Sequence, residues 1–195
     1  RRTYAAALMV AVENKTVSAK ALPADVVRQL RAHGDKLLNK KIDLLWGVSR
    51  STPEAKLKEI EKYKRIAKLR TSVPNNLSKG RALFNRVCVQ CHKLYGEGGE
   101  IGPDITGSDR KNLEYIISNI IDPNGEISND YRTTIVRLKD DRVLVGVIRG
   151  REGKSITVAT PGEVVSVAKQ DVASVESQNF SMMPEGLVLT FSDQE

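Results

Sequence analysis

Apolar residues recur at helical spacing through the first third of the chain, which predicts an α-helical segment over residues 1–71. One run of this pattern starts near Pro23, a residue favoured at helix starts, and ends at Gly47. Its apolar positions are Val26, Val27, Leu30, Leu37, Leu38, Ile42, Leu45 and Trp46.

A further helix is predicted to begin at Thr52-Pro53, where threonine caps the first turn and proline takes the first helical position. Its polar face is rich in lysine and glutamate, and it extends to about Arg70. Its apolar stripe contains Leu57, Ile60, Tyr63 and Ile66. The sequence Val73-Pro74-Asn75-Asn76 then breaks the pattern and predicts a domain boundary.

The middle of the chain predicts two short helices joined by an irregular loop. Ser78 can cap the first helix, which extends to about Val87, and Asp109 can cap the second. Glycine and proline concentrate between them, over residues 96–107. The second helix ends at Asp122-Pro123-Asn124-Gly125. Its apolar positions are Leu113, Ile116, Ile117, Ile120 and Ile121.

From Tyr131 the spacing of apolar residues changes to two, which is typical of β-strands. The predicted strands are residues 134–138, 143–148, 155–159 and 164–167. The segments between them carry Gly, Pro and Asp in positions that suit hairpin turns. We therefore expect a small antiparallel β-unit. At the end of the chain, Ser192-Asp193-Gln194-Glu195 matches a capping box, so we expect a helix to follow Glu195.

The formal net charge of +7 is unevenly distributed. Residues 1–70 contain 17 Lys and Arg against 7 Asp and Glu, whereas the remainder is slightly acidic. We interpret the basic part as a solvated helical face rather than a nucleic-acid site, because no arginine-rich tract is interleaved with aromatic residues. No run approaches the roughly 20 apolar residues that span a bilayer. Two cysteines are too few for a disulfide scaffold.

The motif Cys88-Val89-Gln90-Cys91-His92 is the strongest chemical signal in the chain. A gap of two residues lets both sulfurs reach the two vinyl groups of one porphyrin, and the adjacent histidine is carried beneath the ring to ligate its iron. The motif predicts one covalently bound haem c, attached through Cys88 and Cys91 and ligated by His92.

Three other uses of the two cysteines fit the sequence less well. A structural zinc site needs about four ligands, and beyond the motif the chain offers only the distant His33. A thioredoxin-like dithiol would follow a β-strand, whereas a helix is predicted before Cys88. A chance pair of buried cysteines would not account for the glycine-rich loop that follows.

Spacing alone leaves the second axial ligand of the iron open among four residues. Met9 lies on an apolar helical stripe, where packing is the favoured role. His33 lies beside Gly34 in a basic helix, where a role at the surface or in capping the helix is favoured over ligation. Met182 and Met183 lie in an irregular segment stiffened by Pro184, from which a thioether could reach across a ring.

Seven short motifs from Gly80 onward form a specific combination. They are Gly80-Arg81-Ala82-Leu83-Phe84, Cys88 to His92, Gly96-Glu97-Gly98-Gly99, Gly102-Pro103-Asp104-Ile105-Thr106-Gly107, Ile121-Asp122-Pro123-Asn124, Asp130-Tyr131 and Ser181-Met182-Met183-Pro184-Glu185-Gly186-Leu187. Together they resemble the Pirellula/Verrucomicrobium-type haem-binding domain, a planctomycete family of c-type cytochromes. The resemblance covers nearly all of residues 80–195.

This resemblance implies roles that the spacing leaves open. It implies that Met183, the methionine immediately before proline, is the distal iron ligand. It also implies that the carbonyl oxygen of Pro103 accepts a hydrogen bond from the proximal imidazole. Residues 131–176 are similar to the family's insertion, which shields the haem edge or contacts a protein. The segment 1–71 weakly resembles the part that follows helical repeats and a dehydrogenase-like propeller in longer members.

The expected fold is a mainly α cytochrome c-like core with an inserted small antiparallel β-unit, preceded by an α-helical segment. We divide the chain into four parts. Residues 1–75 are an α-helical fragment of a larger protein, and residues 76–130 are the core with the haem-attachment motif. Residues 131–180 are the β-insertion. Residues 181–195 are the distal methionine loop and the start of a C-terminal helix.

The expected function is that of a monohaem electron carrier, not an enzyme, because no acid–base pair, nucleophile triad or nucleotide loop is present in the sequence. The alternative is a haem sensor or peroxidase-like site whose distal ligand exchanges. Haem c is attached outside the cytoplasm, so we expect a periplasmic or otherwise exported protein. The expected partner is a redox protein or a linked dehydrogenase domain, and the β-unit could also support a homodimer.

Overall fold

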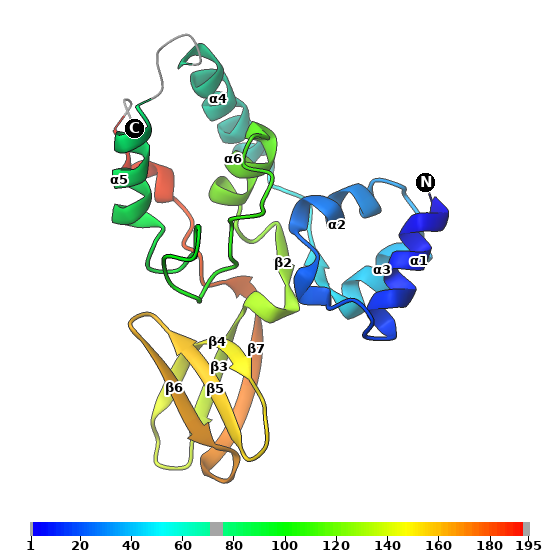
Figure 1. Ribbon diagram of the computed structural model, residues 1–195, viewed down its shortest axis with the longest axis vertical. Helices are drawn as coiled ribbons and strands as arrows, with labels where there is room; N and C mark the ends of the chain where they lie inside the picture. Colours follow the sequence, from blue (N-terminus) through cyan, green and yellow to red (C-terminus); the bar gives the residue numbers. More distant parts are fainter. Residues whose placement is uncertain (1, 71–75, 193–195) are drawn as a thin grey trace.

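The computed structural model of the chain describes residues 2–70 and 76–192. Figure 1 shows three groups of elements: N-terminal helices, a middle group of helices around an irregular loop, and a sheet that projects from the middle group. Helix α4 (Glu54–Arg70) belongs to the N-terminal part of the sequence but packs against α6 (Leu113–Ile121) in the middle group.

The N-terminal helices surround one apolar core. Met9, Val27 and Ile42 are completely buried in it. The indole Nε1 of Trp46 donates a hydrogen bond of 2.9 Å to the carbonyl of Leu22, so this large side chain is buried with its polar atom satisfied. The elements are α1 (Arg2–Glu13), η1 (Ala19–Ala21), α2 (Ala24–Arg31) and α3 (Lys36–Leu45).

The single helical run expected between Pro23 and Gly47 is wrong, because the structure divides it into α2 and α3. Gly34 adopts a positive φ of 68°, a conformation that glycine reaches without steric cost. Asp35 then caps α3, since its carboxylate accepts hydrogen bonds from the backbone N–H groups of Leu37 and Leu38. Both sides of the break are apolar at helical spacing, so the periodicity alone did not reveal it.

A two-stranded antiparallel ribbon joins the N-terminal helices to the middle group. It pairs β1 (Gly47–Ser49) with β2 (Glu126–Ser128), and no apolar alternation in the sequence predicts this pairing. A Cβ atom at Gly47 would lie 2.1 Å from the carbonyl oxygen of Ile127, so only glycine fits there. Gly47 therefore makes this pairing possible in addition to ending the helical run.

The helices before and after the glycine-rich loop are close to those predicted. Helix α5 (Leu77–Val87) leads into Cys88, and α6 follows the loop. The predicted caps Ser78 and Asp109 are wrong, since the side chains of Asn76 and Asn112 accept the hydrogen bonds of the first turns.

The β-unit is an antiparallel sheet of five strands in the order β6-β5-β4-β3-β7. The four predicted strands and their three hairpins are present. The fifth strand, β7, was missed because it alternates irregularly and pairs with β3 through two register shifts. The strands are β3 (Arg132–Leu138), β4 (Val143–Gly150), β5 (Ser155–Thr160), β6 (Glu163–Ala168) and β7 (Val172–Ser181).

Three short 3-10 helices complete the chain: η2 (Asn129–Tyr131), η3 (Lys169–Asp171) and η4 (Leu187–Thr190). The predicted boundary at Val73 to Asn76 and the predicted capping box from Ser192 to Glu195 lie largely outside the described residues. Across residues 2–70 and 76–192, no helix combines the length and apolar character needed to cross a membrane.

Candidate cofactor site

The turn that carries both cysteines and the histidine begins where α5 ends. Cys88 caps the helix, and its N–H donates to the carbonyl of Phe84 at 2.8 Å. The N–H groups of Cys91 and His92 then both donate to the carbonyl of Cys88, at 3.1 and 2.9 Å. This tight turn holds the three side chains of the motif on one short piece of backbone.

Neither cysteine forms a disulfide. Both thiols are partly buried, and this burial raises the pKa of Cys88 and of Cys91, with the neighbouring Cys91 adding to the rise at Cys88. At neutral pH both side chains are therefore protonated thiols, available for attachment of a group.

Two glycines let the following loop approach the turn closely. A Cβ atom at Gly98 would lie 2.2 Å from the carbonyl oxygen of His92, and one at Gly99 would lie 1.9 Å from that of Gln90. The N–H of Gly99 also donates to the carbonyl of Val89 at 2.8 Å. The glycine content of residues 96–107 predicts a loop, but no local pattern shows that these glycines are needed for contact with the motif.

His92 is held by the second half of the same loop. Its Nδ1 lies 2.9 Å from the carbonyl oxygen of Pro103, the contact that the family resemblance implies. Because a carbonyl only accepts, the imidazole donates through Nδ1, and the lone pair on Nε2 is left for a metal. A Cβ atom at Gly102 would lie 2.5 Å from Cε1 of His92, so the backbone also packs against the ring.

Burial lowers the pKa of His92, although the hydrogen bond to Pro103 opposes this effect. The imidazole is therefore neutral at physiological pH. A neutral imidazole with a fixed Nδ1 proton is the form that ligates iron.

The five-stranded sheet contacts both the turn at Cys91 and the loop that follows it. Cys91 and Met182 contact a small apolar cluster formed by Ile101, Val147 and Ala159. This cluster joins the motif, the loop and two strands of the sheet.

Arg149 of β4 reinforces that junction. Its guanidinium lies over the ring of Tyr131, with 5.1 Å between Cζ and the ring centroid, and its Nη2 lies 3.4 Å from the carbonyl oxygen of Gly102. Gly102 is the residue that packs on the His92 imidazole. The β-unit therefore touches the segment that orients the proximal histidine.

Met182 and Met183, the two candidate ligands near the end of the chain, directly follow β7. Met182 is part of the apolar cluster beneath the sheet, whereas Met183 is half-buried and belongs to no apolar cluster of the described residues. The N–H of Met183 donates to Oγ of Ser181 at 3.0 Å. Gly186, with a positive φ of 76°, lets the chain turn away after Met183.

Met9 and His33 lie in the N-terminal helical group. Met9 is completely buried in its apolar core. His33 lies in the turn between α2 and α3. Met9 therefore packs in a different apolar cluster from the one that Cys91 contacts.

The helices around the motif have apolar faces that the protein leaves half-covered. No residue of α5 is buried, and in α6 only Ile121 is. Phe84, Ile116 and Ile120 remain partly accessible. A macrocycle the size of a porphyrin would cover such faces, so the surroundings of the motif as well as its donors fit a haem.

The other uses of the cysteines find no support in the geometry. In the described ranges, no three or more His, Cys, Asp or Glu side chains come together as a metal site would require. The element before Cys88 is a helix, not the strand that precedes a thioredoxin-like dithiol.

Comparison with known proteins agrees with this site. Residues 77–139 match the model of the family described as Cytochrome c. The matched segment takes in α5, the turn from Cys88 to His92, the glycine-rich loop, α6 and β3. No curated protein matches the chain. The family match, over about a third of the chain, supports a c-type cytochrome domain, a class of electron carriers that bind haem covalently.

Proposed function

We propose that this cytochrome c domain is a monohaem electron carrier, with haem attached through Cys88 and Cys91 and iron ligated by His92 and Met183. The observation that carries the proposal is the turn from Cys88 to His92, whose imidazole is oriented by the carbonyl of Pro103 at 2.9 Å. When bound, the haem would supply one-electron chemistry, because its iron can cycle between the ferrous and the ferric state.

The residues of the chain would each contribute one function to this carrier. The thioether bonds from the two cysteines would keep the group bound in both redox states. Pro103 would fix the ring orientation of His92 and make its Nε2 a stronger donor. A methionine thioether opposite the histidine would favour ferrous iron and raise the reduction potential relative to two histidines.

The packing of the neighbouring Met182 supports Met183 as the distal ligand. The side chain of Met182 is engaged in the apolar cluster of Ile101, Val147 and Ala159. Met183 is only half-buried, and its backbone is held by Ser181. The proposal therefore assigns packing to Met182 and ligation to Met183.

Replacing each methionine separately tests this assignment. In Met183→Ala we expect loss of the methionine-to-iron charge-transfer band of the oxidised protein. We also expect a reduction potential lower by roughly 100 mV, within the range of about 0.8 V that axial ligands span. The matched control Met182→Ala should keep the band, because it removes only a packing contact.

An unchanged spectrum and potential in Met183→Ala would contradict the assignment. Rapid and complete carbon monoxide binding by the reduced, unaltered protein would contradict the carrier function. It would instead indicate the exchangeable distal site of a sensor or a peroxidase-like protein.

The proposal also covers the type of haem-binding domain, its location in the cell and its partners. We further propose that the domain is of the planctomycete haem-binding type and that the chain divides into the four parts expected from its sequence. Attachment of haem c outside the cytoplasm supports a periplasmic or otherwise exported location. The electron partner would be another redox protein or a linked dehydrogenase domain. Sedimentation of the purified chain tests whether the β-unit also forms a homodimer.

A further inference from the structure

Lys56 of α4 connects the N-terminal part of the chain to the loop that carries Met183. Its Nζ lies 2.9 Å from Oδ1 of Asp122 and 2.6 Å from Oε1 of Glu185. The Lys56 side chain is 19% exposed, and that of Asp122 is 2% exposed. Asp122 follows α6, and Glu185 is two residues beyond Met183, so one ammonium group joins three separate segments.

The contacts continue from Glu185 to the backbone of Met183. Asn124 donates from Nδ2 to the carboxylate of Glu185 at 2.6 Å, and its Oδ1 accepts from the N–H of Ser181 at 2.8 Å. Oγ of Ser181 then accepts from the N–H of Met183 at 3.0 Å. A chain of four side chains therefore runs from α4 to the methionine.

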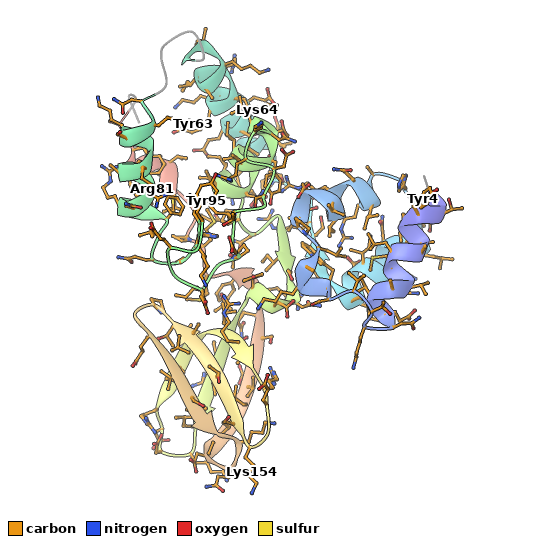
Figure 2. All side chains as sticks on the ribbon, viewed as in Figure 1. Tyr4, Tyr63, Lys64, Arg81, Tyr95 and Lys154 are labelled. Atoms are coloured by element: carbon orange, nitrogen blue, oxygen red, sulfur yellow. The ribbon has the colours of Figure 1, made fainter. Side chains whose placement is uncertain are left out.

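Helix α4, which carries Lys56, is held in place by its packing against α6. It packs along α6, with Ile60 almost completely buried. Lys64, which lies further along the same helix, forms an ion pair with Glu114 of α6. Figure 2 labels Lys64 on this helix. Because the helix is fixed to α6 at several points, the position of Lys56 is fixed relative to the cytochrome domain.

The role of Lys56 toward Glu185 can be separated from its role toward Asp122. Arg50 also binds Asp122, with Nη2 at 2.7 Å from Oδ1 and Nη1 at 3.2 Å from Oδ2. Asp122 thus keeps a cationic partner when Lys56 is replaced. Among the contacts of the described residues, Glu185 has Lys56 as its only cationic partner.

We propose that Lys56 is a positioning residue for the distal ligand, which makes α4 part of the haem site although it lies outside the matched segment 77–139. This rests on Met183 being the ligand. By tying Glu185 to α4, Lys56 holds the loop from Ser181 to Gly186 in its closed arrangement and lowers the population of an open loop with the methionine withdrawn.

The test uses the full chain with haem attached. The first variants are Lys56→Gln, which removes the ammonium, and Glu185→Gln, which keeps an oxygen for Asn124 but removes the charge. Carbon monoxide binds reduced haem only when the distal position opens, so its observed rate measures the open population. We expect each variant to raise this rate about tenfold, or about 1.4 kcal/mol in the opening equilibrium.

Two further variants separate positioning from a general loss of stability. Lys58→Gln removes the exposed pair between Lys58 and Glu54 of the same helix, which are 2.7 Å apart. It should bind carbon monoxide at the unaltered rate, because exposed pairs contribute little. Lys56→Arg keeps the charge at the same position and should restore a rate close to that of the unaltered protein.

Hydrogen exchange gives a second readout that does not depend on a haem ligand. The backbone N–H groups of Ser181 and Met183 are hydrogen-bonded within the anchored loop. In Lys56→Gln and Glu185→Gln they should exchange about tenfold faster, whereas the N–H groups of the inner strands β4 and β5 should keep their rates.

Carbon monoxide and exchange rates equal to those of the unaltered protein in both variants would overturn the role of Lys56. The oxidised, unaltered protein reports on the proposed function separately. If it lacks the methionine-to-iron band, the ligand assignment fails, and the role of Lys56 fails with it. If the band is present and the variants still behave as the unaltered protein, only the role of Lys56 fails.

Discussion

Gly99 shows most directly how a single residue limits the geometry of the haem motif. A Cβ atom there would lie 1.9 Å from the carbonyl oxygen of Gln90, between the two cysteines. Real Cβ atoms do not approach backbone oxygens so closely, so the loop or the turn would have to move. The spacing of the cysteines depends on that turn.

Gly99→Ala should therefore destabilise the haem-loaded protein by about 1–3 kcal/mol in urea unfolding and lower the yield of haem attachment in a pyridine haemochrome assay. Gly80→Ala is the matched control, since a Cβ atom at Gly80 in α5 meets nothing within 4 Å. The control should be neutral or slightly stabilising, because alanine favours a helix over glycine. Equal effects of the two changes would contradict this role of Gly99.

At the residue scale, local motifs were predicted well and close contacts between them were not. The two-residue gap in the motif defines its chemistry without knowledge of the fold. The contact of Gly99 with Gln90 depends on how the loop folds back, which no local pattern records. Met182 packs against Val147 and Ala159, which lie in strands β4 and β5 and are distant from it in the sequence.

At the scale of elements, the helices beside the glycine-rich loop and four strands of the sheet were predicted, whereas the helix caps and the strands β1, β2 and β7 were not. Helix α6 was expected from its apolar spacing, but its cap is Asn112 and not Asp109. Both residue types are good caps, and the backbone conformation decides between them. Strand β7 was missed because its alternation is irregular.

Helix α6 offers a direct test of its cap. The Oδ1 atom of Asn112 accepts a hydrogen bond of 3.1 Å from the N–H of Tyr115. Asn112→Ala should therefore lower the free energy of unfolding by about 1 kcal/mol, as measured by chemical denaturation. Asp109→Ala should change it by no more than a few tenths of that amount, and the reverse order of effects would be inconsistent with this cap.

The turn after α6 makes a pH-dependent contribution to stability. Burial alone would raise the pKa of Asp122, but hydrogen bonds from Lys56, Thr52 and Arg50 outweigh it, so this pKa is lowered overall. A carboxyl group with a lowered pKa stabilises the folded state at pH values above its unfolded-state pKa of about 3.9. This contribution is lost as the pH falls through the lower folded-state pKa.

Asp122→Asn should therefore lower the free energy of unfolding at pH 7 by roughly 3 kcal/mol, the cost of breaking a buried pair. Thermal unfolding followed from pH 7 down to pH 3 should show the difference from the unaltered protein narrowing below about pH 4. A difference that stays constant over this range would show that Asp122 contributes through its shape and not through its charge.

At the scale of the whole molecule, the segment that matches the cytochrome c family is contacted by segments on both sides of it in the sequence. The N-terminal part reaches it through the β1–β2 ribbon, through α4, and through an ion pair of 2.5 Å between Arg28 and Glu126. The sheet reaches it through Arg149 and the apolar cluster at Ile101. Figure 1 shows the N-terminal helices and the sheet extending from the middle group in different directions.

The parts themselves were visible in the sequence because each has its own apolar period. The contacts between them were not, since they join residues such as Arg28 and Glu126 that lie 98 positions apart and have no local signature. The proposed division of the chain into four parts therefore describes sequence patterns, while the contacts of the haem site cross its boundaries.

Covalent attachment of one haem is the claim on which the whole account depends, and the intact mass of the denatured chain tests it most directly. The chain should be produced in a host that attaches haem c and then unfolded in acid before mass spectrometry. The account predicts a mass equal to that of the polypeptide plus one haem, with the haem colour retained by the unfolded chain. A colourless chain with the mass of its amino acids alone would contradict it.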